Sequence, residues 1–142
     1  MPAGDRLIYL VSIAQQALRA RVNAGLKGAG LRLTLAQSAV LFLLLEKDRR
    51  MMSELGEVIG VDNSSITRLI DNLEKNGFAV RKTDPRSRRA IRIHITAAGK
   101  EEAGKARGII SSVNREIKTG FTDGELDAFR RVLRGILELK ET

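Results

Sequence analysis

The chain has 142 residues, of which 43% are hydrophobic and 30% are charged, so it can form one globular domain with a buried core. It contains no cysteine and a single histidine, His94, which excludes disulfides, thiolate catalysis and metal sites built from cysteines or several histidines. The net charge of +8 favours a polyanionic partner. The longest apolar run, residues 39–45, is far shorter than the roughly 20 residues of a membrane-spanning helix, so we expect a cytoplasmic protein that does not cross a membrane.

The first 60 residues have the pattern of three helices. A second helix begins after Thr34, because Thr34 and Gln37 have the spacing of a capping box. A short third helix covers residues 53–59 and ends at Gly60. The first helix, which ends in a glycine-rich segment, carries an apolar residue at every third or fourth position: Leu7, Leu10, Val11, Ala14, Leu18 and Val22.

The fourth helix and the segment after it differ in their apolar period. The helix begins at Asp62 or Asn63, either of which can cap it, and ends in a left-handed turn at Gly77. Apolar and polar residues then alternate, which predicts an antiparallel hairpin over residues 78–96. Phe78 and Val80 are expected on one face of the first strand, together with the second-strand residues Ile91, Ile93 and Ile95.

Two further helices follow the hairpin. Thr96 can cap the first of them, and Thr122 with Glu125 forms a second capping box before the last helix. The apolar stripes of the terminal helices exceed what one small lobe can cover, so we expect them to bind a second copy of the chain. The residues expected at this dimer interface are Leu10, Ile110, Val113, Ile117, Phe129, Leu133 and Ile136.

This order of elements predicts a mainly α fold with a small antiparallel β-hairpin, arranged as a winged helix-turn-helix with N- and C-terminal dimerisation helices. The helix-turn-helix covers residues 53–76 and the wing covers residues 78–96. We expect a single domain over residues 1–142. Within it, residues 34–96 would form the DNA-binding lobe, and residues 5–30 and 97–142 the helical dimerisation region.

Positive charge is densest in the hairpin, where six basic residues and one acid lie between residues 81 and 92. At its tip, Arg86, Ser87 and Arg88 could enter the narrow, negative minor groove of DNA. Charged residues also keep exposed hairpins soluble, but three arginines within four residues favour DNA. On the fourth helix, short polar side chains and an arginine suit contacts with phosphates and base edges, although an ordinary solvated face is the alternative. These residues are Asn63, Ser64, Ser65, Thr67 and Arg68.

The chain resembles the MarR (multiple antibiotic resistance regulator) family of winged helix-turn-helix transcription factors over residues 61–100, VDNSSITRLIDNLEKNGFAVRKTDPRSRRAIRIHITAAGK. The recognition helix ends in the family's Leu-Glu-Lys-x-Gly pattern at residues 73–77. An Asp-x-Arg-[Asp/Ser]-x-Arg wing motif follows at residues 84–89, and a Thr-x-x-Gly motif at residues 96–99. The helices on both sides agree with the family, so the resemblance spans nearly the whole chain.

The resemblance implies a homodimer that places two winged lobes on a pseudopalindromic operator in double-stranded DNA. It implies a repressor that is often released by a small anionic or phenolic ligand between the dimer helices and the winged lobe. We expect no bound cofactor or metal. It also suggests an ion pair between Asp62 and Arg89, at the wing base; capping of the helix by Asp62 alone is the alternative. Met51 departs from the family, which usually has a hydroxyl cap there, and the lack of cysteine excludes thiol-based oxidation sensing.

Two other functional classes are alternatives to a sequence-specific regulator. An architectural or RNA-binding winged-helix protein would use the same basic wing without reading bases, and the affinity ratio between a specific and a random duplex distinguishes it. An enzyme is disfavoured, because the sequence contains no nucleophile–base arrangement, phosphate-binding glycine loop or metal-ligand spacing.

Overall fold

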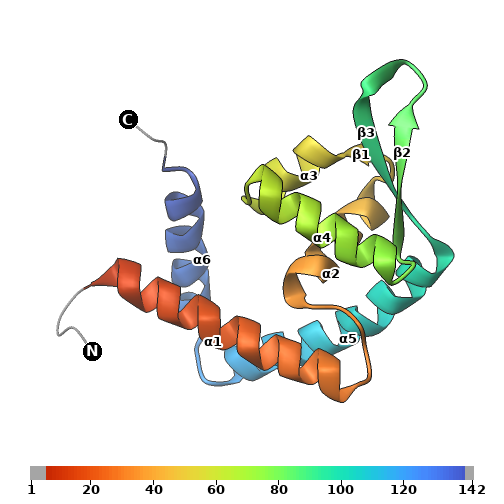
Figure 1. The fold of residues 1–142 in the computed structure, drawn as a ribbon. Helices are drawn as coiled ribbons and strands as arrows, with labels where there is room; N and C mark the ends of the chain where they lie inside the picture. The colour runs from red at the N-terminus through yellow and green to blue at the C-terminus, as the bar shows by residue number, and fades with distance from the viewer. Residues whose placement is uncertain (1–5, 140–142) are drawn as a thin grey trace. The chain divides into compact units, whose positions relative to one another are not determined.

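The computed structural model describes residues 6–139, and Figure 1 shows their helices and strands. The chain consists of two compact units, the first ending at Ile109 and the second beginning at Ile110, so that the boundary falls within a helix. The fold is mainly α with one small antiparallel sheet, which confirms the predicted class. The elements are α1 (Leu7–Gly28), α2 (Leu35–Glu46), β1 (Arg50–Met51), α3 (Met52–Ile59), α4 (Asn63–Lys75), β2 (Ala79–Asp84), β3 (Ser87–Ile95), α5 (Ala97–Thr119) and α6 (Asp123–Leu137).

Helix α2 forms the centre of the first unit and packs against α1, α3, α4 and β3. Its side chains are apolar on almost every side, and Val40, Leu41 and Leu44 are fully enclosed. Helix α4, by contrast, buries one stripe and leaves the other side to solvent. Each fully buried aliphatic side chain stabilises the fold by about 1.5–3 kcal/mol relative to an exposed one.

Local signals in the sequence set the ends of these helices as predicted. Thr34 Oγ1 accepts a hydrogen bond from the Gln37 N–H at 3.2 Å, and Gln37 Oε1 accepts one from the Thr34 N–H at 3.1 Å. Helices α3 and α4 end at Gly60 and Gly77, whose φ angles of 81° and 77° suit a residue without a side chain. Helix α3 begins after Met51 without a side-chain cap, because a thioether offers no strong acceptor.

The sheet has three strands in the order β1-β3-β2, all antiparallel. Strand β1 has only two residues and pairs Arg50 with Ile93. A segment this short has no apolar period, so the sequence could not reveal it.

The register of β2 and β3 corrects one prediction. Arg81 pairs with Ile93, so these two residues share a face of the sheet, whereas Val80 pairs with His94 on the other face. The prediction that Val80 lies on the same face as the isoleucines is therefore wrong. Phe78 lies in the turn before the strand, where its N–H bonds to the Leu73 carbonyl oxygen at 2.8 Å, so its burial does not indicate which face of the sheet the following residues take.

Helix α5 begins in close contact with this turn. The hydroxyl of Thr96 donates to the Gly77 carbonyl oxygen at 2.6 Å and accepts from the Gly99 N–H at 3.0 Å, so Thr96 caps α5 as predicted. A Cβ atom at Gly99 would collide with the carbonyl oxygen of Phe78. The Thr-x-x-Gly motif thus lets the start of α5 approach the backbone that leads into the wing.

The second unit contains the end of α5 and helix α6. The capping box at the start of α6 forms as predicted. The Glu125 N–H donates to Thr122 Oγ1 at 3.1 Å, and the Thr122 N–H donates to Glu125 Oε1 at 3.0 Å. No residue of α6 is buried in this described part of the chain. Its apolar stripe remains accessible, with Phe129 52% and Val132 50% exposed.

Candidate nucleic-acid interface

Helix α4 presents the predicted DNA-reading residues on its open side. Because Ile66, Ile70 and Leu73 take the buried stripe, the polar residues between them turn outward. Ser65 is half-buried, and the four exposed members of the set are Asn63, Ser64, Thr67 and Arg68.

The N-terminus of α4 is fixed by Asp62. Its Oδ1 accepts hydrogen bonds from the Ser65 N–H at 2.8 Å and from the Ser64 hydroxyl at 2.9 Å. These hydrogen bonds, chiefly the one from the Ser65 backbone, hold the pKa of the Asp62 carboxyl below its usual range. Since the Ser64 hydroxyl is engaged by Asp62, Ser64 has less freedom to contact a base.

The ion pair between Asp62 and Arg89 that the family resemblance suggested is not formed. Within residues 6–139, no ion pair joins these two side chains. Asp62 instead caps the N-terminus of α4, which was the alternative. The carboxylate is occupied by the donors at the start of α4. Arg89 is exposed and lines a cavity beside Met51 and Met52.

Arg81 makes the connection between wing and recognition helix that was expected from Asp62. Its Nη2 lies 2.5 Å from Asp71 Oδ1, its Nη1 forms an ion pair with Glu74, and Nη2 also donates to the Thr67 carbonyl oxygen at 3.4 Å. The three α4 residues follow one another at steps of four and three, so they lie on one side of the helix. From the sequence, Arg81 was predicted only to add positive charge to the wing. Asp71 and Glu74, three residues apart and shortly before a basic strand, were a signal for this pairing.

The wing tip is supported by Asp84. Its Oδ1 accepts from the Arg86 N–H at 3.0 Å, and its Oδ2 accepts from Arg92 Nε at 2.8 Å. These hydrogen bonds, the first of them from the Arg86 backbone, lower the pKa of the Asp84 carboxyl. Arg92 also donates to the carbonyl oxygen of Arg49 at 2.9 Å, which ties the hairpin to the turn before β1.

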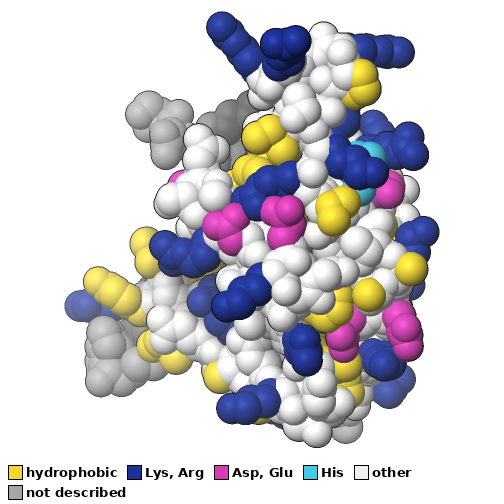
Figure 2. Space-filling model, turned by 45° about the vertical axis from the view of Figure 1, so that its right-hand side comes forward, with side chains coloured by type: hydrophobic (Ala, Val, Ile, Leu, Met, Phe, Trp, Pro, Cys, Tyr) yellow, Lys and Arg dark blue, Asp and Glu magenta, His cyan; other side chains and the backbone are white. Residues whose placement is uncertain are grey.

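Most basic residues of the hairpin take part in no ion pair within the described residues. Arg81 and Arg92 are engaged by acids, but the other four basic residues of the hairpin form no ion pair with another residue in the described range 6–139. Figure 2 shows Lys and Arg side chains gathered at the end of the hairpin. The unpaired residues are Lys82, Arg86, Arg88 and Arg89, and Ser87 is exposed beside them.

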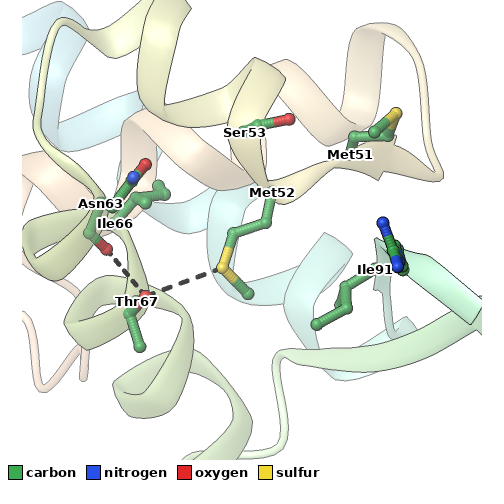
Figure 3. A pocket seen from close by; sticks show the side chains of 8 residues that line it. Met51, Met52, Ser53, Asn63, Ile66, Thr67 and Ile91 are labelled. Atoms are coloured by element: carbon green, nitrogen blue, oxygen red, sulfur yellow. Dashed lines mark hydrogen bonds between the residues drawn. The ribbon is translucent and has the colours of Figure 1, made fainter.

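A cavity of about 290 Å³, here called the wing cavity, lies between α3, α4 and β3. Figure 3 shows the side chains around it. Asn63 and Thr67 of the predicted reading set belong to this side of α4. The full lining consists of Met51, Met52, Ser53, Asn63, Ile66, Thr67, Arg89 and Ile91.

A second cavity of about 290 Å³, here called the α1–α4 cavity, lies on the other side of the recognition helix. Two arginines and no acid line it, so it offers positive charge to a small anion. Ser65 and Arg68 of the reading set belong to this side. The full lining consists of Arg19, Asn23, Thr34, Ala36, Val61, Ser65, Arg68, Leu69 and Asn72.

No helix in the described residues is long and apolar enough to cross a membrane. Residues 6–139 contain no group of three or more His, Asp or Glu side chains that could hold a metal ion.

The comparison with known families agrees with this geometry. Residues 33–91 match the model of the MarR family. Over these residues the chain is similar to the MarR family. The matched segment contains α2, the α3–α4 pair and the wing up to Ile91.

The chain is also similar to several transcriptional regulators. The uncharacterized HTH-type transcriptional regulator YkoM of Bacillus subtilis (strain 168) is 36% identical over 67 residues, which span 47% of this chain and 44% of YkoM. A MarR-family transcriptional regulator from Rhodococcus sp. RHA1 has a TM-score of 0.83 at 25% identity and covers 100% of this chain and 99% of its own. The repressor CouR, in a structure with a 23-mer DNA duplex, has a TM-score of 0.82 at 25% identity, with 93% of this chain and 92% of its own covered.

Proposed function

We propose that the protein is a dimeric, ligand-responsive transcriptional repressor that binds a pseudopalindromic operator. The observation that carries this proposal is the exposed polar side of α4 next to a hairpin whose tip arginines lack ion-pair partners in the described chain. A helix of this kind fits the major groove of B-form DNA, where each base pair shows a distinct pattern of donors and acceptors. CouR, the relative with a DNA duplex in its structure, supports the same partner.

The two reading elements have different tasks. Asn63, Thr67 and Arg68 of α4 can approach base edges, since their side chains are exposed near the start of the helix. Arg86 and Arg88 can enter the adjacent minor groove, where selection depends on groove width and negative potential. Asp62 and Asp84 are assigned to support, because each carboxylate orders a backbone segment that presents these side chains.

The homodimer is supported by apolar surface left exposed in each unit. On α1, Leu7, Ile8 and Leu10 are 59%, 80% and 48% exposed, and on α6 the stripe with Phe129 and Ile136 is also open. Clusters of this kind mark binding surfaces more often than free surface. Val113 is only 3% exposed within one chain, so it offers little surface to a partner. The residues proposed at the interface are Leu10, Ile110, Val113, Ile117, Phe129, Leu133 and Ile136.

The α1–α4 cavity is the proposed effector site. Arg19 of α1 and Arg68 of α4 can both contact a carboxylate, so a small anionic or phenolic ligand would bridge α1 and the recognition helix. CouR has also been solved with p-coumaroyl-CoA, at 27% identity and a TM-score of 0.79. A ligand that draws Arg68 toward the cavity would remove it from the DNA-facing set and weaken DNA binding.

The proposal is tested by selecting operators from random duplex DNA and measuring affinity by fluorescence anisotropy at several salt concentrations. A sequence-specific repressor binds its selected duplex at least about 10³ times more tightly than a scrambled duplex. An architectural winged-helix protein would bind both equally, and an RNA-binding one would prefer RNA. The protein is proposed to act in the cytoplasm, as a regulator and not as an enzyme.

The effector site is tested separately with p-hydroxybenzoate as the probe anion. Titration should weaken operator binding by the wild type, and Arg19→Ala should lose this response while keeping its affinity for DNA. Arg32→Ala is the control, since Arg32 is exposed and does not line the cavity. Equal responses from both variants would remove the cavity from the proposal.

A further inference from the structure

Both internal methionines of the chain line the wing cavity. The chain has three methionines and no cysteine, and Met51 and Met52 are the only two within the described residues 6–139. After thiols, thioethers are the protein groups that two-electron oxidants attack most readily. The chemistry that oxidises sulfur is therefore concentrated beside the recognition helix.

Met52 is the one of the two that faces α4. It is the first residue of α3, it is half-buried, and its Sδ lies 3.8 Å from Thr67 Oγ1. Figure 3 shows the Met52 side chain reaching toward Thr67, whereas the Met51 side chain points away from it. An oxidant of a few atoms can reach Met52, because the cavity it lines holds about 290 Å³.

An oxygen atom added to Met52 would change a contact of the recognition helix. The Thr67 hydroxyl now donates to the Asn63 carbonyl oxygen at 2.7 Å, and the thioether beside it is a weak acceptor. A sulfoxide oxygen is a strong acceptor that competes for this proton. It is also a polar group placed next to the apolar lining residues Ile66 and Ile91, where burial without a hydrogen bond is unfavourable.

The start of α3 has no side-chain cap that would hold it against such a change. Met51, in the capping position, supplies no side-chain hydrogen bond, so the first turn is held by the ion pair of Arg50 with Glu54 and by packing around Met52. On the far side of the cavity, Ile91 belongs to the wing. A rearrangement at Met52 would thus disturb Thr67 in α4 and Ile91 in β3. These two residues belong to the recognition helix and the wing, the two proposed reading elements.

We propose that Met52 is a reversible oxidation site whose sulfoxide lowers the affinity of the protein for its operator, an inference that rests on the proposed DNA-binding function. Hypochlorous acid transfers its oxygen atom to Sδ, so that the sulfur loses two electrons while chloride and a proton are released. A dithiol-dependent methionine sulfoxide reductase restores the thioether, forming a disulfide on the reductant and water.

The test uses Met51→Leu, which keeps Met52, and Met52→Leu, which keeps Met51. Both variants keep Met1, so its oxidation cannot cause a difference between them. Each is treated with hypochlorous acid, the added oxygen is located by peptide mass spectrometry, and each is compared with its own untreated form on the selected operator. Oxidised Met51→Leu should bind at least about tenfold more weakly and recover with the reductase, whereas Met52→Leu should change less than about twofold. Equal losses, or none in Met51→Leu, would overturn the proposal.

Hydrogen exchange separates this inference from the proposed function. If the untreated wild type selects no DNA, the repressor proposal fails, and amide exchange over residues 52–67 and 87–95 still decides the role of Met52. Oxidation should speed exchange in both segments of Met51→Leu and leave those of Met52→Leu unchanged. Unchanged exchange in Met51→Leu with full oxidation at Met52 would show that the sulfoxide is tolerated, which contradicts the inference.

Discussion

Arg81 of β2 and Asp71 of α4 form an ion pair with 2.5 Å between Nη2 and Oδ1, and Glu74 engages the same guanidinium. The Arg81 side chain is only 26% exposed, so this pair is less screened than one on the open surface. It fixes the direction of the wing strand relative to the recognition helix. Both proposed DNA-reading elements therefore depend on one side chain of β2.

Replacing Arg81 with alanine should loosen the wing against α4. Two acids on one side of α4 would lose their partner, so the free energy of unfolding should fall by about 1 kcal/mol, as measured by urea denaturation. Operator affinity should fall as well, since the two elements would no longer be held in register. Lys82→Ala is the matched control for stability, because Lys82 is the next residue of the same strand and forms no ion pair within residues 6–139. Equal stability of the two variants would contradict this role.

Gly99→Ala should destabilise the protein through a backbone collision. The added Cβ would meet the Phe78 carbonyl oxygen, which neither α5 nor the turn can easily move, so a loss of about 1–3 kcal/mol is expected in thermal or urea unfolding. Gly104→Ala in the same helix is the control, because a Cβ there meets nothing within 4 Å. That variant should gain up to about 1 kcal/mol from the helix propensity of alanine. Similar effects at both positions would show that helix propensity alone governs Gly99.

Arg86→Ala and Thr67→Ala should separate the wing from the recognition helix. Removal of the Arg86 side chain should weaken binding to many duplexes together, most where the minor groove is narrow and A·T-rich, and reduce the log-log salt slope by about 0.9 for each phosphate that is no longer neutralised. Thr67→Ala should instead change which bases are preferred. Titrations of cognate and scrambled duplexes at several salt concentrations measure both effects. An unchanged slope and affinity in Arg86→Ala on every duplex would leave the charged tip as a solubilising feature only.

Charge on the exposed stripe of α6 should dissociate the dimer while leaving the fold intact. Phe129 and Ile136 are 52% and 40% exposed in the single chain, so Phe129→Asp with Ile136→Asp removes no side chain from a buried core. Sedimentation should show a dimer for the wild type at micromolar concentration and a folded monomer for the double variant, whose operator affinity falls because only one half-site is bound. A monomeric wild type would contradict the dimer.

Acid should weaken the wing through Asp84. Because hydrogen bonds from the Arg86 backbone and Arg92 lower the pKa of this carboxyl in the folded state, its contribution is complete above the ordinary pKa of about 4 and is lost as the pH falls through the lower folded-state value. Asp84→Asn should therefore be less stable at neutral pH and lose less stability between pH 5 and 2 than the wild type does, as followed by denaturation at each pH. Glu57→Gln is the control, because Glu57 is exposed and has no ion-pair partner within residues 6–139. Parallel pH profiles for Asp84→Asn and the wild type would contradict this assignment.

The amino-acid sequence by itself determined the order and ends of the helices, the wing and its tip. Capping pairs such as Thr34 with Gln37 and turn glycines such as Gly77 act within a few residues, so their effect can be read from local spacing. The concentration of arginines at residues 86–89 is likewise a local property, and it indicated a nucleic-acid partner before any contact was known.

The tertiary structure alone decided which charged residues form ion pairs and which side of each helix or strand faces the core or the solvent. Sequence spacing could not choose between Arg81 and Arg89 as the residue that holds the wing to α4, because both lie in the hairpin and the choice depends on strand register. The two-residue strand β1 and the two cavities beside α4 also arise from segments far apart in the chain. Contacts of this kind form only when packing closes the loops between them, and a register shift of one residue would exchange the faces of the hairpin.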